Sequence, residues 1–229
     1  MSQIAFRRSQ VYHFFAGTFL YPQENWLEDL PIVAGILEEL KMLQGWVFGH
    51  ASQDFSLLDL QSEHRRTFGL TGSQCYETEF GLPHEFRQSQ ELADIAGFYQ
   101  AFGFKVGGTV RERPDHLAVE LEFMYVLALK EAYATTNGSQ EQVEICREAQ
   151  GKFLGDHLGR WIGLFAKSLS QSSLDGPYLA LAQFAAAYVE ADAKGLGLRL
   201  EQPQLAGISP TPLGPDLSCE DCLVAENLR

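Results

Sequence analysis

The sequence has few cysteines and no apolar run long enough to cross a membrane. Its four cysteines, Cys75, Cys146, Cys219 and Cys222, are too few and too scattered for a disulfide framework in a chain of 229 residues. A reducing cytoplasm is therefore the expected location. The longest apolar run, residues 178–189, has 12 residues, well short of the ~20 that a membrane helix needs. We expect no membrane insertion.

Positive charge is also scarce. Lys and Arg number 17 against 30 Asp and Glu, which gives a net charge of −13. Such a surface repels nucleic acid and anionic lipid on average and attracts a cationic partner. An acidic surface also aids solubility, so the charge alone leaves both interpretations open.

Several functional motifs are missing as well. The glycines have neither a Walker spacing nor a dinucleotide fingerprint, and no Gly-x-Ser-x-Gly elbow occurs. We expect no cofactor. No segment alternates apolar and polar residues with β-branched side chains, and no repeat of fixed period is present, which argues against sheets and solenoids.

The patterns that are present predict an all-α fold with a core rich in phenylalanine, of which the chain has 16. Residues 1–201 are predicted to form a single helical, bundle-like domain, and residues 202–229 an irregular tail that holds four of the nine prolines. A linker over residues 69–89 has no helical period, so it is the first place to look for binding. Helices are predicted over residues 3–20, 31–43, 57–68, 91–102, 114–135, 141–169 (with Gly151, Gly155 and Gly159 favouring a break) and 177–193.

The helix that begins near Arg113-Pro114-Asp115-His116 is predicted to be central. Pro114 favours the first turn of a helix and Asp115 favours its positive end. Apolar residues then cover most of the circumference as far as Ala128, which is too apolar for a surface helix.

Arg7 and Arg8, followed by an apolar stretch, suggest a twin-arginine signal peptide. The stretch contains His13, runs into Tyr21-Pro22 and lacks an Ala-x-Ala cleavage site, so we reject that interpretation. Both arginines are instead expected on an exposed helix face.

Two blocks of sequence resemble one protein family. Pro114-Asp115-His116 with the apolar helix after it is similar to the signature of the TorD/DmsD/NarJ family, cytoplasmic chaperones that mature molybdenum enzymes. The later family helix and the one that follows it are matched by Phe153, Leu154, His157, Leu158, Trp161, Phe165 and, after Gly176-Pro177, Tyr178. The similarity covers roughly residues 57–192 and implies a TorD-like helical fold.

The resemblance implies a non-enzymatic chaperone. Such a protein binds the apo catalytic subunit of a molybdenum oxidoreductase, through its twin-arginine leader peptide or another N-terminal segment. It assists cofactor insertion and assembly, and blocks export until the cofactor is in place. The resemblance is compatible with a monomer or a homodimer.

Seven residues are candidates for partner binding. By resemblance, Pro114, Asp115 and His116 contact the bound segment, and aromatic positions near the linker receive its apolar part; these are His64, Phe68, Tyr76 and Phe80. Family members carry tryptophan where His64 stands and leucine where Thr67 stands, which implies a more polar groove here. Helix capping and core packing are the alternatives. His116 is expected to be largely exposed, and loss of Asp115 to cost only a helix cap.

Two rival functions remain open. Cys219 and Cys222 form a Cys-x-x-Cys pair that could serve a small metal-binding or redox protein, although no second cysteine pair completes a zinc site. A helical-bundle enzyme could use carboxylates and an imidazole at one helix start, namely Asp115, His116, Glu120 and Glu122. No Glu-x-x-His pair supports a carboxylate-bridged metal centre there.

Overall fold

The computed structural model describes residues 2–43, 48, 55–69, 75–80, 87–107, 112–172 and 175–201. Within these ranges the chain forms α-helices and two short 3-10 helices, and no strand, so the predicted all-α fold is confirmed. The α-helices are α1 (Ser2–Thr18), α2 (Leu30–Leu40), α3 (Leu57–Phe68), α4 (Arg87–Ala101), α5 (Leu117–Thr136), α6 (Gln140–Asp156), α7 (Leu158–Gln171) and α8 (Pro177–Gly195). The 3-10 helices are η1 (Trp26–Asp29) and η2 (Glu77–Glu79).

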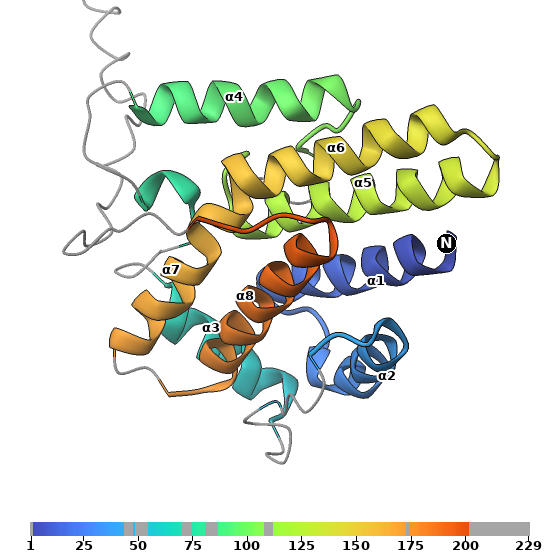
Figure 1. Cartoon of the computed structure of the whole chain (residues 1–229). Coiled ribbons are helices and arrows are strands. Elements are labelled where there is room, and N and C mark those ends of the chain that lie inside the picture. The colour runs from blue at the N-terminus through green and yellow to red at the C-terminus, as the bar shows by residue number, and fades with distance from the viewer. Residues whose placement is uncertain are drawn as a thin grey trace, which may run out of the picture.

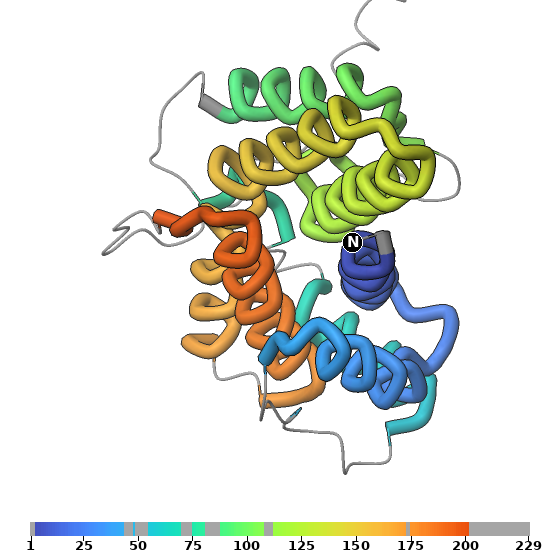
Figure 2. Tube along the Cα trace, turned by 45° about the vertical axis from the view of Figure 1, so that its right-hand side comes forward, coloured from blue at the N-terminus to red at the C-terminus, as the bar shows by residue number. Residues whose placement is uncertain are grey.

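Helix α5 lies at the centre of one half of the molecule. Figure 1 shows α1 and α6 on either side of it, both antiparallel to it, with α4 beyond α6. Figure 2 shows α7 and α8 packed together in the other half, next to α2 and α3. The helix is buried on most of its circumference, as its all-round apolar pattern predicted.

Aromatic rings fill the core, as the phenylalanine content predicted. Phe123 of α5 lies 4.8 Å from Phe153 of α6 and from Tyr99 of α4, measured between ring centroids. In the other half, Phe15 of α1 lies 5.1 Å from Phe184 of α8. These edge-to-face and tilted contacts join helices that are far apart in sequence.

Helices α6 and α7 are separated at His157, within the glycine-containing stretch where the sequence favoured a break. Close packing requires the glycine at position 159, because a Cβ there would lie 2.6 Å from Leu200 Cδ2. The segment after α8 therefore packs directly on the start of α7.

Helix α5 begins at Leu117, so the predicted start at Pro114 is wrong. Pro114 and Asp115 form a turn in which His116 N donates to the Arg113 carbonyl at 3.1 Å. The backbone next to this turn bonds to the linker instead of continuing the helix: Leu117 N donates to the Cys75 carbonyl at 2.8 Å. Residues 40 positions upstream thus decide where the helix starts.

Arg7 and Arg8 do not share an exposed face, which corrects the prediction from the sequence. Arg7 is half-buried and pairs with Glu39 of α2. Arg8 is 6% exposed and pairs with Asp192 of α8 at 2.5 Å and with Glu131 of α5 at 3.0 Å. One face of α1 is the core face, and the buried acidic partners allow it to carry an arginine.

The helices that are described include none long and apolar enough to cross a membrane. The proline-rich tail, with Cys219 and Cys222, lies outside the described residues. The division of the chain at residue 201 therefore stays a prediction.

Candidate functional site

The linker residues 75–79 lie directly against the start of α5. Glu77 N donates to the Asp115 carbonyl at 2.9 Å, and Tyr76 forms an isolated antiparallel bridge with His116. The rings of Tyr76 and His116 meet edge to face at 5.1 Å. The structure thus brings together candidate residues from two separate parts of the chain, Tyr76 with Asp115 and His116.

Asp115 is fully buried in a polar network. Its Oδ2 accepts hydrogen bonds from Thr78 Oγ1 at 2.8 Å and from Arg113 Nη2 at 2.7 Å, and its Oδ1 accepts from Arg113 Nε at 3.0 Å. Arg113 Nη2 also donates to Thr78 Oγ1 at 2.9 Å. Asp115 therefore joins linker and helix and does not cap α5, which corrects the prediction.

His116 is the N-cap of α5, and it is 6% exposed where exposure was predicted. Its Nδ1 accepts a hydrogen bond from Ala118 N at 3.1 Å, so the ring is neutral with its proton on Nε2. Burial, with smaller effects from His64 and Arg113, lowers the pKa of His116 to about 4. The linker covers the ring, and no sequence pattern near His116 signals that cover.

Tyr76 is half-buried and connects the network to the surface. The guanidinium of Arg113 lies 4.6 Å above its ring, and its hydroxyl donates to Glu112 at 3.0 Å. Burial raises the pKa of Tyr76, so the hydroxyl stays a donor. Sequence reasoning missed Thr78, Arg113 and Glu112 as members of this site, because their roles depend on contacts at a separation of over 30 residues.

The other aromatic candidates form a chain of rings on α3 and α7. His64 lies 5.0 Å from Phe68, and Phe68 stacks on Phe165 at 6.4 Å. Phe80, which follows η2, stacks on Trp161 at 5.4 Å and contacts Phe165 at 6.5 Å. The candidates His64, Phe68 and Phe80 are each half-buried, so both packing and partner contact remain open to them.

A second buried polar group lies behind η2. Glu77 accepts from or donates to His157 Nδ1 at 3.1 Å, and Glu120 Oε2 accepts from Trp161 Nε1 at 3.0 Å. Burial raises the pKa of both Glu77 and Glu120. These contacts fix η2 and α5 to the α6–α7 joint. They also explain His157 and Trp161 as packed structural residues, as the sequence indicated.

The four residues considered for a helical-bundle enzyme point to different partners. Asp115 bonds Arg113, His116 caps α5, Glu120 bonds Trp161, and Glu122 is exposed. In the part of the chain that the structure describes, no three His, Cys, Asp or Glu side chains are placed to hold a metal ion.

A groove of about 660 Å³ opens beside this region. Its walls come from the end of α1 and from residues 20–29, and Glu112 closes one side. The sequence did not identify this groove, because none of its lining residues belongs to a motif.

Comparison with known proteins identifies the family. A family profile described as nitrate reductase delta subunit matches residues 32–167, which include α3, α4 and α5 and most of the site. The chain belongs to the nitrate reductase delta subunit family. The match confirms the resemblance to the TorD/DmsD/NarJ family.

Relatives within and around this family carry chaperone names. The chain is 29% identical over 160 residues to a chaperone protein TorD of Vibrio cholerae, a match that covers 70% of this chain and 69% of the relative. It is 33% identical over 111 residues to the selenate reductase assembly chaperone protein of Thauera selenatis, covering 48% of this chain and 55% of the relative. A chlorate reductase assembly chaperone protein of Ideonella dechloratans is 36% identical over 78 residues, covering 34% and 39%.

Glu79 makes stability at this site depend on pH. It is 2% exposed, and burial raises its pKa from the ordinary 4.5 to about 7. The folded state therefore keeps the Glu79 proton over a pH range in which the unfolded chain has released it. This stabilisation is complete below about pH 4.5 and is lost as the pH rises through about 7.

We expect Glu79→Gln to remove this loss. Relative to the original chain, the variant should gain at least about 1.4 kcal/mol of unfolding free energy between pH 5 and pH 8, the equivalent of one pKa unit. Urea unfolding at both pH values measures the difference, with Glu122→Gln on the exposed face of α5 as the control. Parallel pH profiles for Glu79→Gln and the original chain would contradict the prediction.

Proposed function

We propose that this chain is an assembly chaperone that binds the apo catalytic subunit of a molybdenum oxidoreductase. It holds an N-terminal leader or equivalent segment of that subunit, assists cofactor insertion, and delays export or assembly until the cofactor is in place. The observation that carries the proposal is the family match over residues 32–167, together with relatives named as reductase assembly chaperones.

The partner-binding surface in this proposal consists of seven residues, five of which are half-buried. His64, Phe68, Tyr76, Phe80 and Pro114 supply the accessible part of that surface, while Asp115 and His116 hold it in place from beneath. Side chains of this mixed exposure can bury apolar residues of a partner without refolding.

The proposal includes a protein without enzymatic activity, working in the cytoplasm as a monomer or homodimer. The named relatives are chaperones, which makes enzymatic activity the less favoured alternative. The comparisons give no support to the metal or redox protein based on Cys219 and Cys222, and the family match ends at residue 167.

Native co-purification tests the proposal. The chain, carrying an affinity tag at its own chromosomal locus, should capture the large catalytic subunit of a molybdenum oxidoreductase, identified by mass spectrometry. A matched control is the same experiment in cells unable to make the molybdenum cofactor, where the captured amount should rise because the apo form accumulates. Capture of no reductase subunit under either condition would contradict the proposal.

A further inference from the structure

The groove beside the site has apolar walls and a rigid shape. Phe14, Leu20, Pro22 and Trp26 contribute the apolar surface, and Tyr21, 39% exposed, stands at the mouth. Phe14 and Trp26 meet edge to face at 6.4 Å. A volume of about 660 Å³ is large enough for several side chains of an extended peptide.

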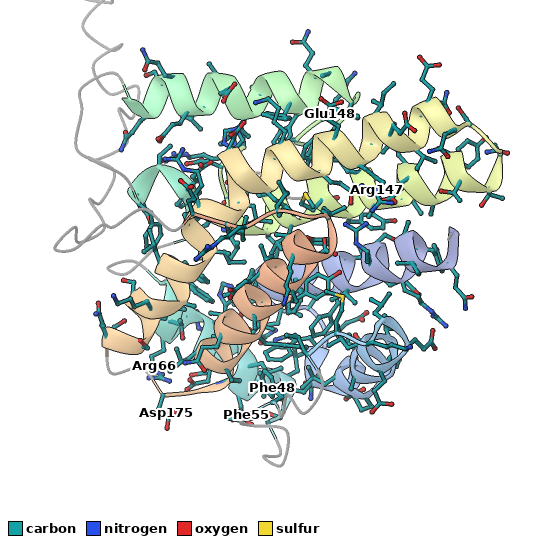
Figure 3. The ribbon with its side chains drawn as sticks, in the orientation of Figure 1. Phe48, Phe55, Arg66, Arg147, Glu148 and Asp175 are labelled. Carbon is teal, nitrogen blue, oxygen red and sulfur yellow. The ribbon has the colours of Figure 1, made fainter. Side chains whose placement is uncertain are left out.

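Contacts with three other elements hold the outer wall, residues 21–29. Gln61 of α3 donates to the Pro22 carbonyl at 3.0 Å, and Asn25 Nδ2 donates to the Phe55 carbonyl at 2.9 Å. Trp26 Nε1 donates to the Tyr178 hydroxyl at 3.4 Å. Figure 3 shows Phe55 near Phe48 at the end of the molecule where this wall is anchored. A wall fixed in this way lowers the ordering cost of binding.

The charge of the groove is negative. Glu24, Asp29 and Glu112 line it, and among all its lining residues there is no lysine or arginine, only His13 as a weak base. A cationic side chain entering the groove would therefore meet acceptors without a competing basic residue of the lining, next to apolar surface that excludes water.

The chain already places its own arginines against tyrosines at both ends of the groove. At the mouth, the Arg65 guanidinium lies 5.7 Å from the Tyr21 ring centre, and its Nη1 donates to the Tyr21 hydroxyl. At the other end, Arg113 lies over Tyr76, whose hydroxyl donates to the groove residue Glu112. Tyrosine and carboxylate pairs thus accept guanidinium groups in this neighbourhood.

The same two tyrosines connect the groove to the proposed partner-binding residues. Tyr21 meets His64 edge to face at 5.5 Å, and Tyr76 meets His116 at 5.1 Å. The groove therefore lies between the two groups of candidate residues and borders both.

We propose that this groove receives the arginine-bearing part of the client's N-terminal segment, with the apolar residues that follow it lying towards His64 and Phe68. The inference rests on the proposed function and adds to it a specific subsite: Glu24, Asp29 and Glu112 bind guanidinium, and Phe14 and Trp26 contact its methylene stem. The groove sets the orientation of the segment, because charge and apolar surface are at different ends of the bound region.

The probe is a synthetic peptide with two adjacent arginines followed by an apolar run, titrated by calorimetry. The variant Glu24→Gln, Asp29→Asn, Glu112→Gln should bind it at least tenfold more weakly than the original chain. Glutamine at position 112 can still accept from the Tyr76 hydroxyl, and Glu24 and Asp29 are exposed, so the fold and the melting temperature should be unchanged.

A matched control removes the same number of charges elsewhere. Glu141, Glu144 and Glu148 are exposed on α6 (Glu148 is labelled in Figure 3), and their replacement by glutamine should change affinity less than threefold. A second peptide, with both arginines replaced by glutamine, should bind the original chain and the groove variant with nearly equal affinity.

The outcomes separate the inference from the proposed function. If the original chain binds neither peptide and captures no reductase subunit in cells, the proposed function fails. If it binds the arginine peptide but the groove variant and the α6 control behave alike, the groove is not the arginine site and the inference is overturned. Equal binding of both peptides by the original chain would overturn it as well.

Discussion

Replacing Asp192 with alanine should lower the free energy of unfolding by about 3 to 5 kcal/mol, the cost of leaving a buried charge without its partner. Asp192 is 2% exposed and accepts hydrogen bonds from Arg8 Nε at 2.5 Å, Arg8 Nη2 at 2.8 Å and the Tyr12 hydroxyl at 2.8 Å. The substitution removes all three acceptor contacts at once. The network joins α1 to α8, so its loss should affect the whole domain.

Arg8 remains charged when Asp192 is removed. Burial disfavours the charged form of Arg8, but Asp192 outweighs burial and raises its pKa. Without Asp192, the guanidinium keeps only Glu131 at 3.0 Å and Gln150 at 2.6 Å as acceptors. An arginine does not release its proton at accessible pH, so the cost appears as lost stability.

Urea unfolding measures the effect. The control is Asp156→Ala, which breaks an exposed pair with Lys152 at 2.5 Å and should cost no more than about 1 kcal/mol. A loss for Asp192→Ala as small as that of the control would show that the buried network contributes little to stability.

The second large effect is expected for Asp115→Ala, at about 2 to 3 kcal/mol of unfolding free energy. The substitution leaves the Thr78 hydroxyl and Arg113 without their shared acceptor. Water reduces the cost on the arginine side, because the Arg113 side chain is 31% exposed. The linker should then separate from the start of α5 before the domain unfolds.

Thermal melting and hydrogen exchange together test this prediction. Asp115→Asn keeps an acceptor for Thr78 and should recover part of the loss, while Glu122→Ala on the exposed face of the same helix should cost little. If Asp115→Ala melted at the same temperature as the original chain, the network would be unimportant. A cap-like role would then be sufficient to explain the residue.

This cost changes how a role of Asp115 in binding is tested. An effect of Asp115→Ala on affinity would mix lost contacts with a displaced linker. Tyr76→Phe removes only the hydroxyl bond to Glu112 and leaves the ring over which Arg113 lies, so it separates the two effects. Peptide affinity of Tyr76→Phe is therefore the more direct readout of the surface.

Local patterns in the sequence were sufficient for most of the fold. Helix α3 has the predicted bounds, 57–68, because Ser56 and Asp59 form a capping box and Gly69 follows the last turn. Helix α8 starts at Pro177 as predicted. The predicted start of α5 was wrong because the backbone of residues 115–117 pairs with residues 75–77, a contact at long range.

The candidate site was predictable in its residue types and not in its contacts. The family resemblance selected Tyr76 and His116, and the structure brings them together. It did not reveal that Asp115 and His116 are buried, or that Arg8 pairs with three side chains from three other helices. The groove depends on the path of residues 20–29 around the end of α1, which no local pattern specifies.

The most direct test of the central claim compares two forms of the same client. Purified chain is titrated with the catalytic subunit of the captured reductase, once without its molybdenum cofactor and once fully loaded. The account predicts that the apo form binds at least tenfold more tightly, a difference of about 1.4 kcal/mol. Equal affinity for the two forms, or tighter binding of the loaded enzyme, would contradict a role in maturation.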